Sequence, residues 1–257
     1  MQKGSHQGAA DIIIPVRNRY ADTRALLESI YRHTGYLFHI YIIDDASTDE
    51  TVDLGKIYTR DITILRNRLS RGRSAALNKG IQAGSNPYLV FLNNEIELAQ
   101  GWLENMVAFL DTHPRIAAVG PLQSGSQGWQ GVERVRATLV PEIPCFLTRD
   151  IQERNRILQY HFHHTGILID GTLSFSCCVL ARRAVEDVGP VLELDAGRVE
   201  ADYCRRLRKS GYVLGLALDV YVAGRNGAIE GAPRKIARPK AQSEAGRARL
   251  PRLSVRH

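Results

Sequence analysis

The feature that constrains the fold most is a pair of short apolar runs that each stop abruptly at polar residues. Residues 12–16 read IIIPV and lead into RNR, whereas residues 39–43 read HIYII and lead into DDASTD. The intervening residues 21–33 place apolar side chains at helical spacing, among them Leu26 and Ile30. Strand, helix and strand within about forty residues predict a βαβ unit, whose two strands run parallel.

The ends of these two strands are the expected ligand-binding positions, because parallel sheets bind ligands beyond the carboxyl ends of their strands. Asp44 and Asp45 follow the second strand. Their carboxylates suit hydrogen-bond donors on the base or ribose of a nucleotide, and they are unsuited to cradle its phosphates. Pro15, Val16 and Arg17 end the first strand and are expected beside the same nucleotide.

Length and composition fit one large domain with a short extension, since the chain has 257 residues and an ordinary apolar fraction of 44%. No apolar stretch approaches the roughly 20 residues that span a bilayer, and no signal-peptide core is present at the N-terminus. The four cysteines have no metal-ligand spacing. We therefore expect buried, reduced thiols in a cytoplasmic protein, and neighbouring Cys177 and Cys178 on opposite faces of a strand.

The net charge of +7 is located entirely in residues 225–257, which contain nine Lys or Arg and two Asp or Glu. Few large apolar residues accompany these charges, so a basic, disordered tail is expected over residues 229–257. Such a tail could contact the anionic inner face of a membrane, or it could be merely solvated. Nucleic acid is not expected as a partner. Residues 1–10 are expected to form a disordered leader.

The string IIIPVRNR … IIDDASTDET resembles the opening of a family 2 glycosyltransferase. This resemblance implies the GT-A fold, a single α/β domain with a mixed, mainly parallel central sheet flanked by helices. Its nucleotide-sugar-binding half would cover residues 11–120 and its acceptor half residues 121–228. The implied reaction is inverting transfer of a sugar from a UDP-, GDP- or TDP-sugar to a glycan, lipid-linked or protein acceptor. The implied cofactor is Mg²⁺ or Mn²⁺.

Three other interpretations stay open. The first is a catalytically degenerate module of the same fold that only binds a nucleotide sugar or serves as a scaffold. The second is a nucleotidyltransferase, although the loop after the first strand lacks the glycine-rich phosphate-binding sequence typical of those enzymes. The third is an unrelated open α/β domain whose strand-end loops happen to be polar.

The remaining periodicity predicts an alternating order of strands and helices up to residue 120. Strands are expected over residues 62–65, 88–92, 116–120, 173–180 and 213–222. Helices are expected over residues 74–83, 101–111, 149–160, 182–188 and 199–210. Residues 121–170 show little pattern outside the helix at 149–160, and this stretch is expected to carry the acceptor side and a mobile loop.

Asn93, Asn94 and Glu95 stand where the resembling family has its metal-binding Asp-x-Asp. A cation at that place neutralises the departing diphosphate, and oxygen ligands suit magnesium or manganese. Because the first acid is an amide here, Glu95 is the expected metal ligand. The two asparagines are expected to contact the donor.

Arg71 and Arg73 precede a helix that contains Asn78, where the resembling family approaches the nucleotide. Either guanidinium could pair with phosphate oxygens, and Asn78 is expected near the donor as well. The alternative is that both arginines are simply exposed in a basic stretch.

The segment at residues 199–208 resembles the family's Glu-Asp-x-Asp helix, which places its general base on Glu200. Asp202 is the second acid considered for catalysis. Residues two apart on a helix point about 200° apart, so the two acids cannot both face one substrate. Asp202 also has a possible ion-pair partner four residues later in Arg206. Glu200 is therefore the preferred base.

Two further features qualify this assignment. The resembling family often has a histidine after the last strand, but Gly224 occupies that position. His161, His163 and His164 have no strong zinc-binding spacing, and a surface or acceptor-loop role is expected for them. Trp129 lies in a Gly/Ser-rich loop and could stack on a sugar ring.

Overall fold

The computed structural model describes residues 8–126, 128–195, 197–224 and 252–254. The strands are β1 Ala10–Val16, β2 Phe38–Asp44, β3 Ile62–Arg66, β4 Tyr88–Leu92, β5 Ile96–Leu98, β6 Ile116–Gln123, β7 Thr165–Ile169, β8 Cys177–Ala181, β9 Val213–Gly224 and β10 Arg252–Ser254. The helices are α1 Tyr20–His33, α2 Leu54–Ile57, α3 Arg73–Ala83, α4 Trp102–Thr112, α5 Val132–Thr138, α6 Ile151–Phe162, α7 Arg182–Val188 and α8 Val199–Lys209, with a short 3₁₀ helix at Glu50–Asp53.

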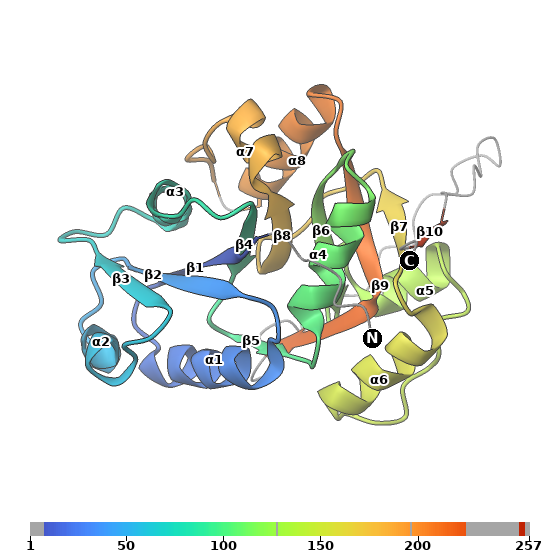
Figure 1. Cartoon of the computed structure of the whole chain (residues 1–257), viewed down its shortest axis with the longest axis horizontal. Coiled ribbons are helices and arrows are strands. Elements are labelled where there is room, and N and C mark those ends of the chain that lie inside the picture. Colours follow the sequence, from blue (N-terminus) through green and yellow to red (C-terminus); the bar gives the residue numbers. More distant parts are fainter. Residues whose placement is uncertain (1–7, 127, 196, 225–251, 255–257) are drawn as a thin grey trace.

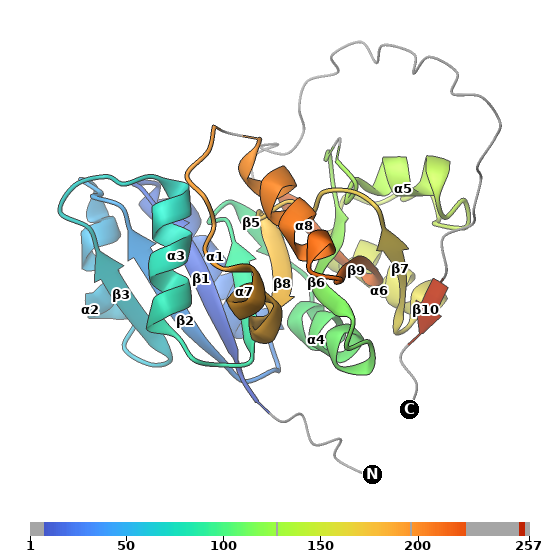
Figure 2. The same cartoon turned by 90° about the horizontal axis from the view of Figure 1, so that it is seen from above.

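One ten-stranded sheet organises the molecule, in the order β10-β7-β9-β6-β8-β4-β1-β2-β3, with β5 paired to β9. The pairs β4–β1, β1–β2 and β2–β3 are parallel, as is β6–β9. Strands β5, β7 and β8 run against the others. In Figure 1, α3, α7 and α8 lie above the sheet and α1 and α2 below it, and Figure 2 shows the upper layer from above. The predicted α/β fold with a mixed, largely parallel sheet is confirmed.

Alternate residues of each strand pack into two cores on opposite faces of the sheet. Ile13 of β1 packs into the core under α3, α7 and α8, whereas Ile12 packs into the core with α1 and α4. Cys178 and Cys177 divide between the same two cores, as predicted. Three of the four thiols are buried, but Cys145 is exposed, against the prediction.

The βαβ unit and the helix at residues 182–188 are confirmed, but several short elements of the structure were not predicted, namely the 3₁₀ helix, α2, β5, α5 and β7. Strand β5 has only three residues, α5 is a short helix within residues 121–170, and β7 follows α6 after two histidines. The strand predicted from residue 173 begins only at Cys177. Short elements carry little periodicity, so their position depends on the sheet that they join.

The two ends of the chain differ from the expectation at a few residues. Ala10, predicted to be in the leader, already pairs with Phe38 in the sheet. Arg252–Ser254, predicted to be in the disordered tail, form β10 and pair antiparallel with β7. The rest of the predicted leader and tail, residues 1–7, 225–251 and 255–257, lies outside the described residues. None of the helices in the described ranges is long and apolar enough to cross a membrane.

Candidate active site

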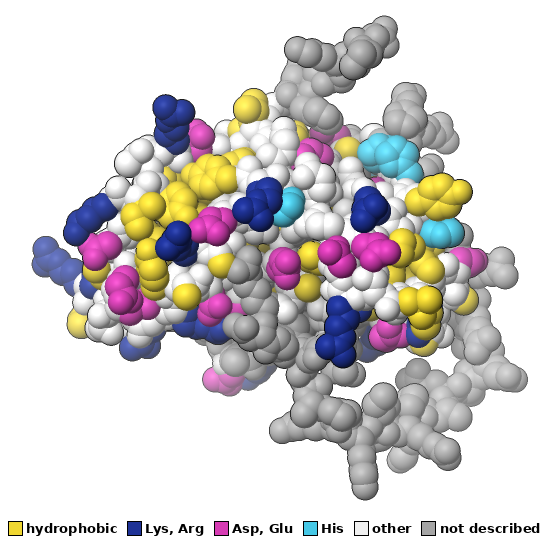
Figure 3. Space-filling view, turned by 90° about the horizontal axis from the view of Figure 1, so that it is seen from below, with side chains coloured by type: hydrophobic (Ala, Val, Ile, Leu, Met, Phe, Trp, Pro, Cys, Tyr) yellow, Lys and Arg dark blue, Asp and Glu magenta, His cyan; other side chains and the backbone are white. Residues whose placement is uncertain are grey.

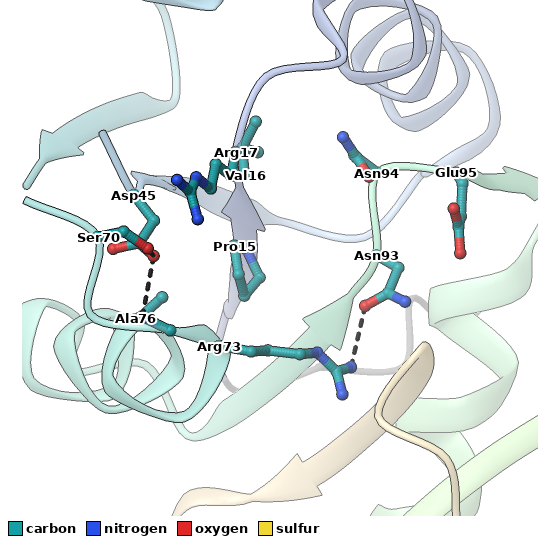
Figure 4. A pocket seen from close by; sticks show the side chains of 11 residues that line it. Pro15, Val16, Arg17, Asp45, Ser70, Arg73, Ala76, Asn93, Asn94 and Glu95 are labelled. Carbon is teal, nitrogen blue, oxygen red and sulfur yellow. Dashed lines mark hydrogen bonds between the residues drawn. The ribbon is translucent and has the colours of Figure 1, made fainter. Parts of the chain in front are cut away.

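A cavity of about 300 Å³ lies beyond the carboxyl ends of β1 and β4. The chain leaves β1 for β2 on one side and later returns to β4 on the other side, so this is the switch point at which such sheets bind ligands. Most of the predicted donor-binding residues meet there (Figure 4). The cavity is lined by Pro15, Val16, Arg17, Asp45, Ser70, Gly72, Arg73, Ala76, Asn93, Asn94 and Glu95.

The carboxylate of Asp45 organises the loop between β3 and α3. It accepts hydrogen bonds from Ser70 Oγ at 2.6 Å and Asn67 Nδ2 at 2.9 Å. The backbone amides of Arg71 and Gly72 also donate to it, at 2.8 and 2.9 Å. Burial raises the pKa of this carboxyl group, but the four hydrogen bonds outweigh burial and lower the pKa to about 2. Asp45 therefore lines the cavity as a fixed negative charge.

Asp44 does not have the predicted contact with the cavity. Its side chain is 1% exposed, with Oδ1 accepting from the backbone amide of Ser47 at 2.8 Å and Oδ2 from Arg66 Nη1 at 3.1 Å. It is not among the lining residues of the cavity. Asp44 thus holds the turn after β2, and Asp45 is the acid that faces the site.

The strand-end residues Asn93, Asn94 and Glu95 line the cavity as predicted, and each has a partner from another element. Glu95 Oε2 accepts from Arg19 Nη1 at 2.7 Å. Asn94 Nδ2 donates to Thr23 Oγ1 of α1 at 3.0 Å. Gly224 pairs with Ile96, so the position where the resembling family has its histidine lies one residue from Glu95 along the paired strands.

Arg19 was not predicted as a site residue. It has a left-handed backbone conformation with φ of 64°, as has Asn18 with φ of 59°. Such a conformation is uncommon for residues other than glycine and marks a sharp turn after β1. The turn brings the guanidinium of Arg19 to Glu95, although the two residues are 76 positions apart. No local sequence pattern could have revealed this pair.

The two arginines around Gly72 differ in their placement. Arg73 Nη2 donates to Asn93 Oδ1 at 2.9 Å, and Arg73 Nη1 donates to Glu200 Oε1 at 2.8 Å. The side chain of Arg71 lines a neighbouring basic cavity instead. Asn78 lines that neighbouring cavity too, and both ends of its amide bind the backbone of Val191, at 2.7 and 2.8 Å. The predicted donor contact of Asn78 is therefore replaced by a link between α3 and the loop after α7.

The two candidate acids of α8 face different surroundings, as helical geometry requires. Glu200 lines a second cavity of about 300 Å³. Asp202, the second acid considered for catalysis, forms ion pairs with Arg205 at 2.5 Å and with Arg206 at 2.8 Å, of which only the pair with Arg206 was expected. The second cavity is lined by Ser126, Gly128, Trp129, Gln130, Thr172, Leu173, Ser174, Gly197 and Glu200. Glu200 and Trp129 therefore face the same space.

Solved structures share this architecture. The chain superposes on a mannosyltransferase from Pyrobaculum calidifontis, solved with GDP-Man and Mn²⁺, with a TM-score of 0.64 at 18% identity, covering 85% of this chain and 57% of that one. It superposes on residues 1–349 of TarS from S. aureus, solved with UDP-GlcNAc, with a TM-score of 0.60 at 15% identity, covering 87% and 61%. The fold is the GT-A fold.

The sequence identifies the family. The profile described as Glycosyl transferase family 2 matches residues 11–189, so the chain belongs to this family. It is 28% identical over 207 residues to the pre-mycofactocin glycosyltransferase of Mycobacterium tuberculosis, covering 78% of this chain and 39% of that protein. It is 27% identical over 174 residues to the uncharacterized glycosyltransferase YibD of Escherichia coli, covering 64% and 51%. The chain thus spans between about a third and a half of the length of the curated relatives it matches.

Proposed function

We propose that this chain transfers a sugar from a nucleotide-diphosphate sugar to an acceptor hydroxyl, with inversion at the anomeric carbon. The observation that carries the proposal is the guanidinium of Arg73, which joins the donor-side Asn93 to Glu200 at the acceptor side. The first cavity, lined by Arg73, is called the donor cavity below. It adjoins the cavity of Glu200 at the ion pair between Arg73 and Glu200. A sugar bound where the two cavities meet would have the guanidinium of Arg73, which can bind phosphate, on one side. It would have the carboxylate of Glu200 on the other side.

The nucleotide would lie in the donor cavity, with its base and ribose beside Pro15–Arg17 and Asp45. Its diphosphate would extend toward Arg73 and the strand-end residues 93–95. Similar structures have been solved with GDP-Man and with UDP-GlcNAc, which supports a nucleotide-sugar donor of either base. The positive charge of Arg73 would stabilise the diphosphate as it departs, because an arginine can pair bidentately with phosphate oxygens.

Glu200 would act as the general base in a single displacement. It would accept the proton of the acceptor hydroxyl while that oxygen attacks the anomeric carbon and the nucleoside diphosphate leaves. Of the two candidate acids on α8, Glu200 is the one that lines a cavity, because Asp202 is held by Arg205 and Arg206. The resting ion pair between Arg73 and Glu200 suggests an order of events. Donor phosphate would compete for Arg73 and so free Glu200 to accept a proton.

A divalent cation fits this site through Glu95. Mg²⁺ is commonly held by one or two carboxylates together with substrate phosphates and water, so a single acid is sufficient. The mannosyltransferase with the same fold was solved with Mn²⁺. When bound, the cation would supply further neutralisation of the diphosphate. In the structure Arg19 pairs with Glu95 at 2.7 Å and also with Asp22. For Glu95 to hold the cation, Arg19 would have to release Glu95 and pair with donor phosphate, or keep only its pair with Asp22.

The acceptor would bind in the second cavity, where Trp129 offers the flat apolar face that a sugar ring can cover. The guanidinium of Arg134 lies 4.6 Å from the centroid of the Trp129 ring and helps to fix its orientation. Thr172, Gln130 and Ser174 add polar groups to the same cavity, next to Glu200. This combination suits a carbohydrate acceptor, whether free, lipid-linked or attached to protein.

The test is a transfer assay with UDP-, GDP- and TDP-sugars, comparing the wild type with Glu200→Gln and Asp202→Asn. We expect Glu200→Gln to keep donor binding and to lose about 10²- to 10⁴-fold in kcat. Asp202→Asn is the matched control on the same helix, and we expect it to lose little activity. Full turnover by Glu200→Gln would refute the base assignment. Nucleotide binding by the wild type without transfer or hydrolysis of any donor would favour the degenerate binding module.

A further inference from the structure

Three metal-ligating side chains meet at the end of the molecule opposite to the donor half of the sheet. His163 and His164 form the turn between α6 and β7, and Asp219 lies on β9. One ligand atom from each lies within 4.8 Å of the other two. None of the three lines the donor cavity or the cavity of Glu200. Figure 3 shows histidine side chains on the surface at the end of the molecule that carries α6.

The backbone of the turn brings the two rings together. Consecutive residues in extended chain point to opposite sides, but His164 has a left-handed conformation with φ of 50°. As a result the ring centroids of His163 and His164 are 3.8 Å apart. The backbone amide of His164 donates to Asp219 Oδ2 at 2.9 Å, which fixes the turn against β9. An uncommon conformation that groups three ligands is a reason to look for a function.

Asp219 is a buried acid on β9. Its side chain is 2% exposed, and within the described ranges it forms no ion pair with a lysine or arginine. A buried carboxylate is stable when a cation or metal ion compensates its charge. The two imidazoles beside it are ligands that favour a transition metal over Mg²⁺.

We propose that His163, His164 and Asp219 bind one Zn²⁺ ion, with water as the fourth ligand, which fastens the α6–β7 turn to β9. Donor atoms around a tetrahedral zinc are about 3.3 Å apart, given Zn–N and Zn–O distances near 2.0–2.1 Å. The present ligand atoms lie within 4.8 Å of one another, so zinc binding requires a shift of the exposed His163 side chain toward the other two ligands. The sequence alone does not reveal the site, because Asp219 lies 55 positions after His164.

The test is titration of the untagged full chain, first stripped with a chelator, with Co²⁺ as a spectroscopic substitute for Zn²⁺. We expect one Co²⁺ per chain with the strong visible absorption of tetrahedral coordination, and displacement of Co²⁺ by Zn²⁺. His163→Ala and Asp219→Asn should lose at least tenfold in affinity. His161→Ala is the matched control, since His161 is an exposed histidine of the same helix end outside the cluster, and it should bind normally.

The variant Glu95→Gln distinguishes this site from the proposed cation site beside the donor. It removes the acid proposed to hold the donor's cation and should leave the Co²⁺ spectrum unchanged. Because His163 is exposed, its alanine variant tests the proposal without altering the core. The proposal is overturned if the wild type gives no tetrahedral spectrum, or if His163→Ala binds as the wild type does. It is also overturned if His161→Ala loses as much affinity, which would indicate adsorption to surface histidines. Transferase activity that persists without zinc would leave the proposed function intact.

Discussion

At the scale of single residues, two acids of the site, Glu95 and Glu200, are each paired with an arginine. Glu95 pairs with Arg19, and Glu200 pairs with Arg73. These pairs join elements that are distant in sequence, so they hold the two sides of the site in register before any ligand is present. Both guanidiniums are also the groups that a diphosphate would attract. In the resting site Glu95 and Glu200 are therefore neutralised by partners that a bound diphosphate could displace.

Asp45 provides a pH prediction at this scale. Its folded pKa of about 2 lies below its ordinary value of 3.8, so its contribution to stability is present above pH 4 and is lost as the pH falls toward 2. The difference corresponds to about 2 kcal/mol. Asp45→Asn should unfold at lower denaturant concentration at pH 6 and should show a flatter decline between pH 4 and pH 2. Parallel pH curves for both proteins, measured by denaturant unfolding, would contradict the assignment.

The sequence predicted the individual site residues unevenly, for physical reasons. Helical periodicity separated Glu200 from Asp202, and the structure places them as the 200° rotation requires. Strand ends are less predictable, because a side chain there can turn into the protein as easily as into the cavity. The side chain of Asp44 turns into the protein, whereas that of Asp45 lines the cavity. The pairing of Arg19 with Glu95 depends on how strands assemble, which no local pattern contains.

At the scale of secondary-structure elements, the sheet depends on a buried ion pair between two elements distant in sequence. Asp11 at the start of β1 binds Arg182 Nη2 of α7 at 2.7 Å. Asn86 also binds the carboxylate of Asp11. Its backbone amide donates at 2.9 Å and its side-chain Nδ2 donates at 2.7 Å. The first strand of the sheet is thereby fixed to a helix that follows β8.

We predict that Arg182→Met destabilises the protein by about 3–5 kcal/mol, because it leaves the buried carboxylate of Asp11 without its cation. The double variant Asp11→Leu with Arg182→Met should recover part of this loss, since it removes the charge as well. Denaturant unfolding of both variants measures the effect. Arg24→Met, which breaks an exposed ion pair with Glu28 on α1, is the control and should cost well under 1 kcal/mol. Equal losses for the two single variants would contradict the prediction.

Elements with a clear apolar pattern were predictable, whereas β5 and β7 were not. The apolar periods of 2 and 3.6 located β1, α1, β2 and α8 to within a few residues. Strand β5 has three residues and exists because it pairs with β9 at Ile96 and Gly224. Strand β7 exists because β9 offers it a free edge. Such strands are defined by their neighbours, so the sequence of the strand alone carries too little signal.

At the scale of the whole molecule, β10 continues the sheet with residues from the basic C-terminal segment. Its three residues pair with β7 at Thr165, Gly166 and Ile167. The segment therefore has at least one structural role, while its contact with an anionic membrane and a location at that surface stay predictions. The lining residues of the donor cavity, within the part of the chain that the structure describes, all precede residue 96.

Deletion of residues 229–257 tests this division of roles. We predict that the truncated protein binds donor nucleotide as the full chain does but has a lower melting temperature. It should also aggregate more readily, because β7 becomes an unpaired edge strand. Nucleotide titration and thermal unfolding monitored by light scattering measure the two effects. Loss of nucleotide binding in a folded truncated protein would show that the segment belongs to the donor site.

The most direct test of the proposed donor site is calorimetric titration of UDP, GDP and TDP into the wild type, Arg73→Met and Arg71→Met. We predict that one of the three nucleotides binds with a stoichiometry of one. Arg73→Met should weaken that binding about tenfold or more, the loss of one charge-assisted contact of at least about 1.4 kcal/mol. Arg71→Met should change it less than about twofold, because its side chain lines the neighbouring cavity. Binding of none of the nucleotides, or equal weakening by both variants, would contradict the account.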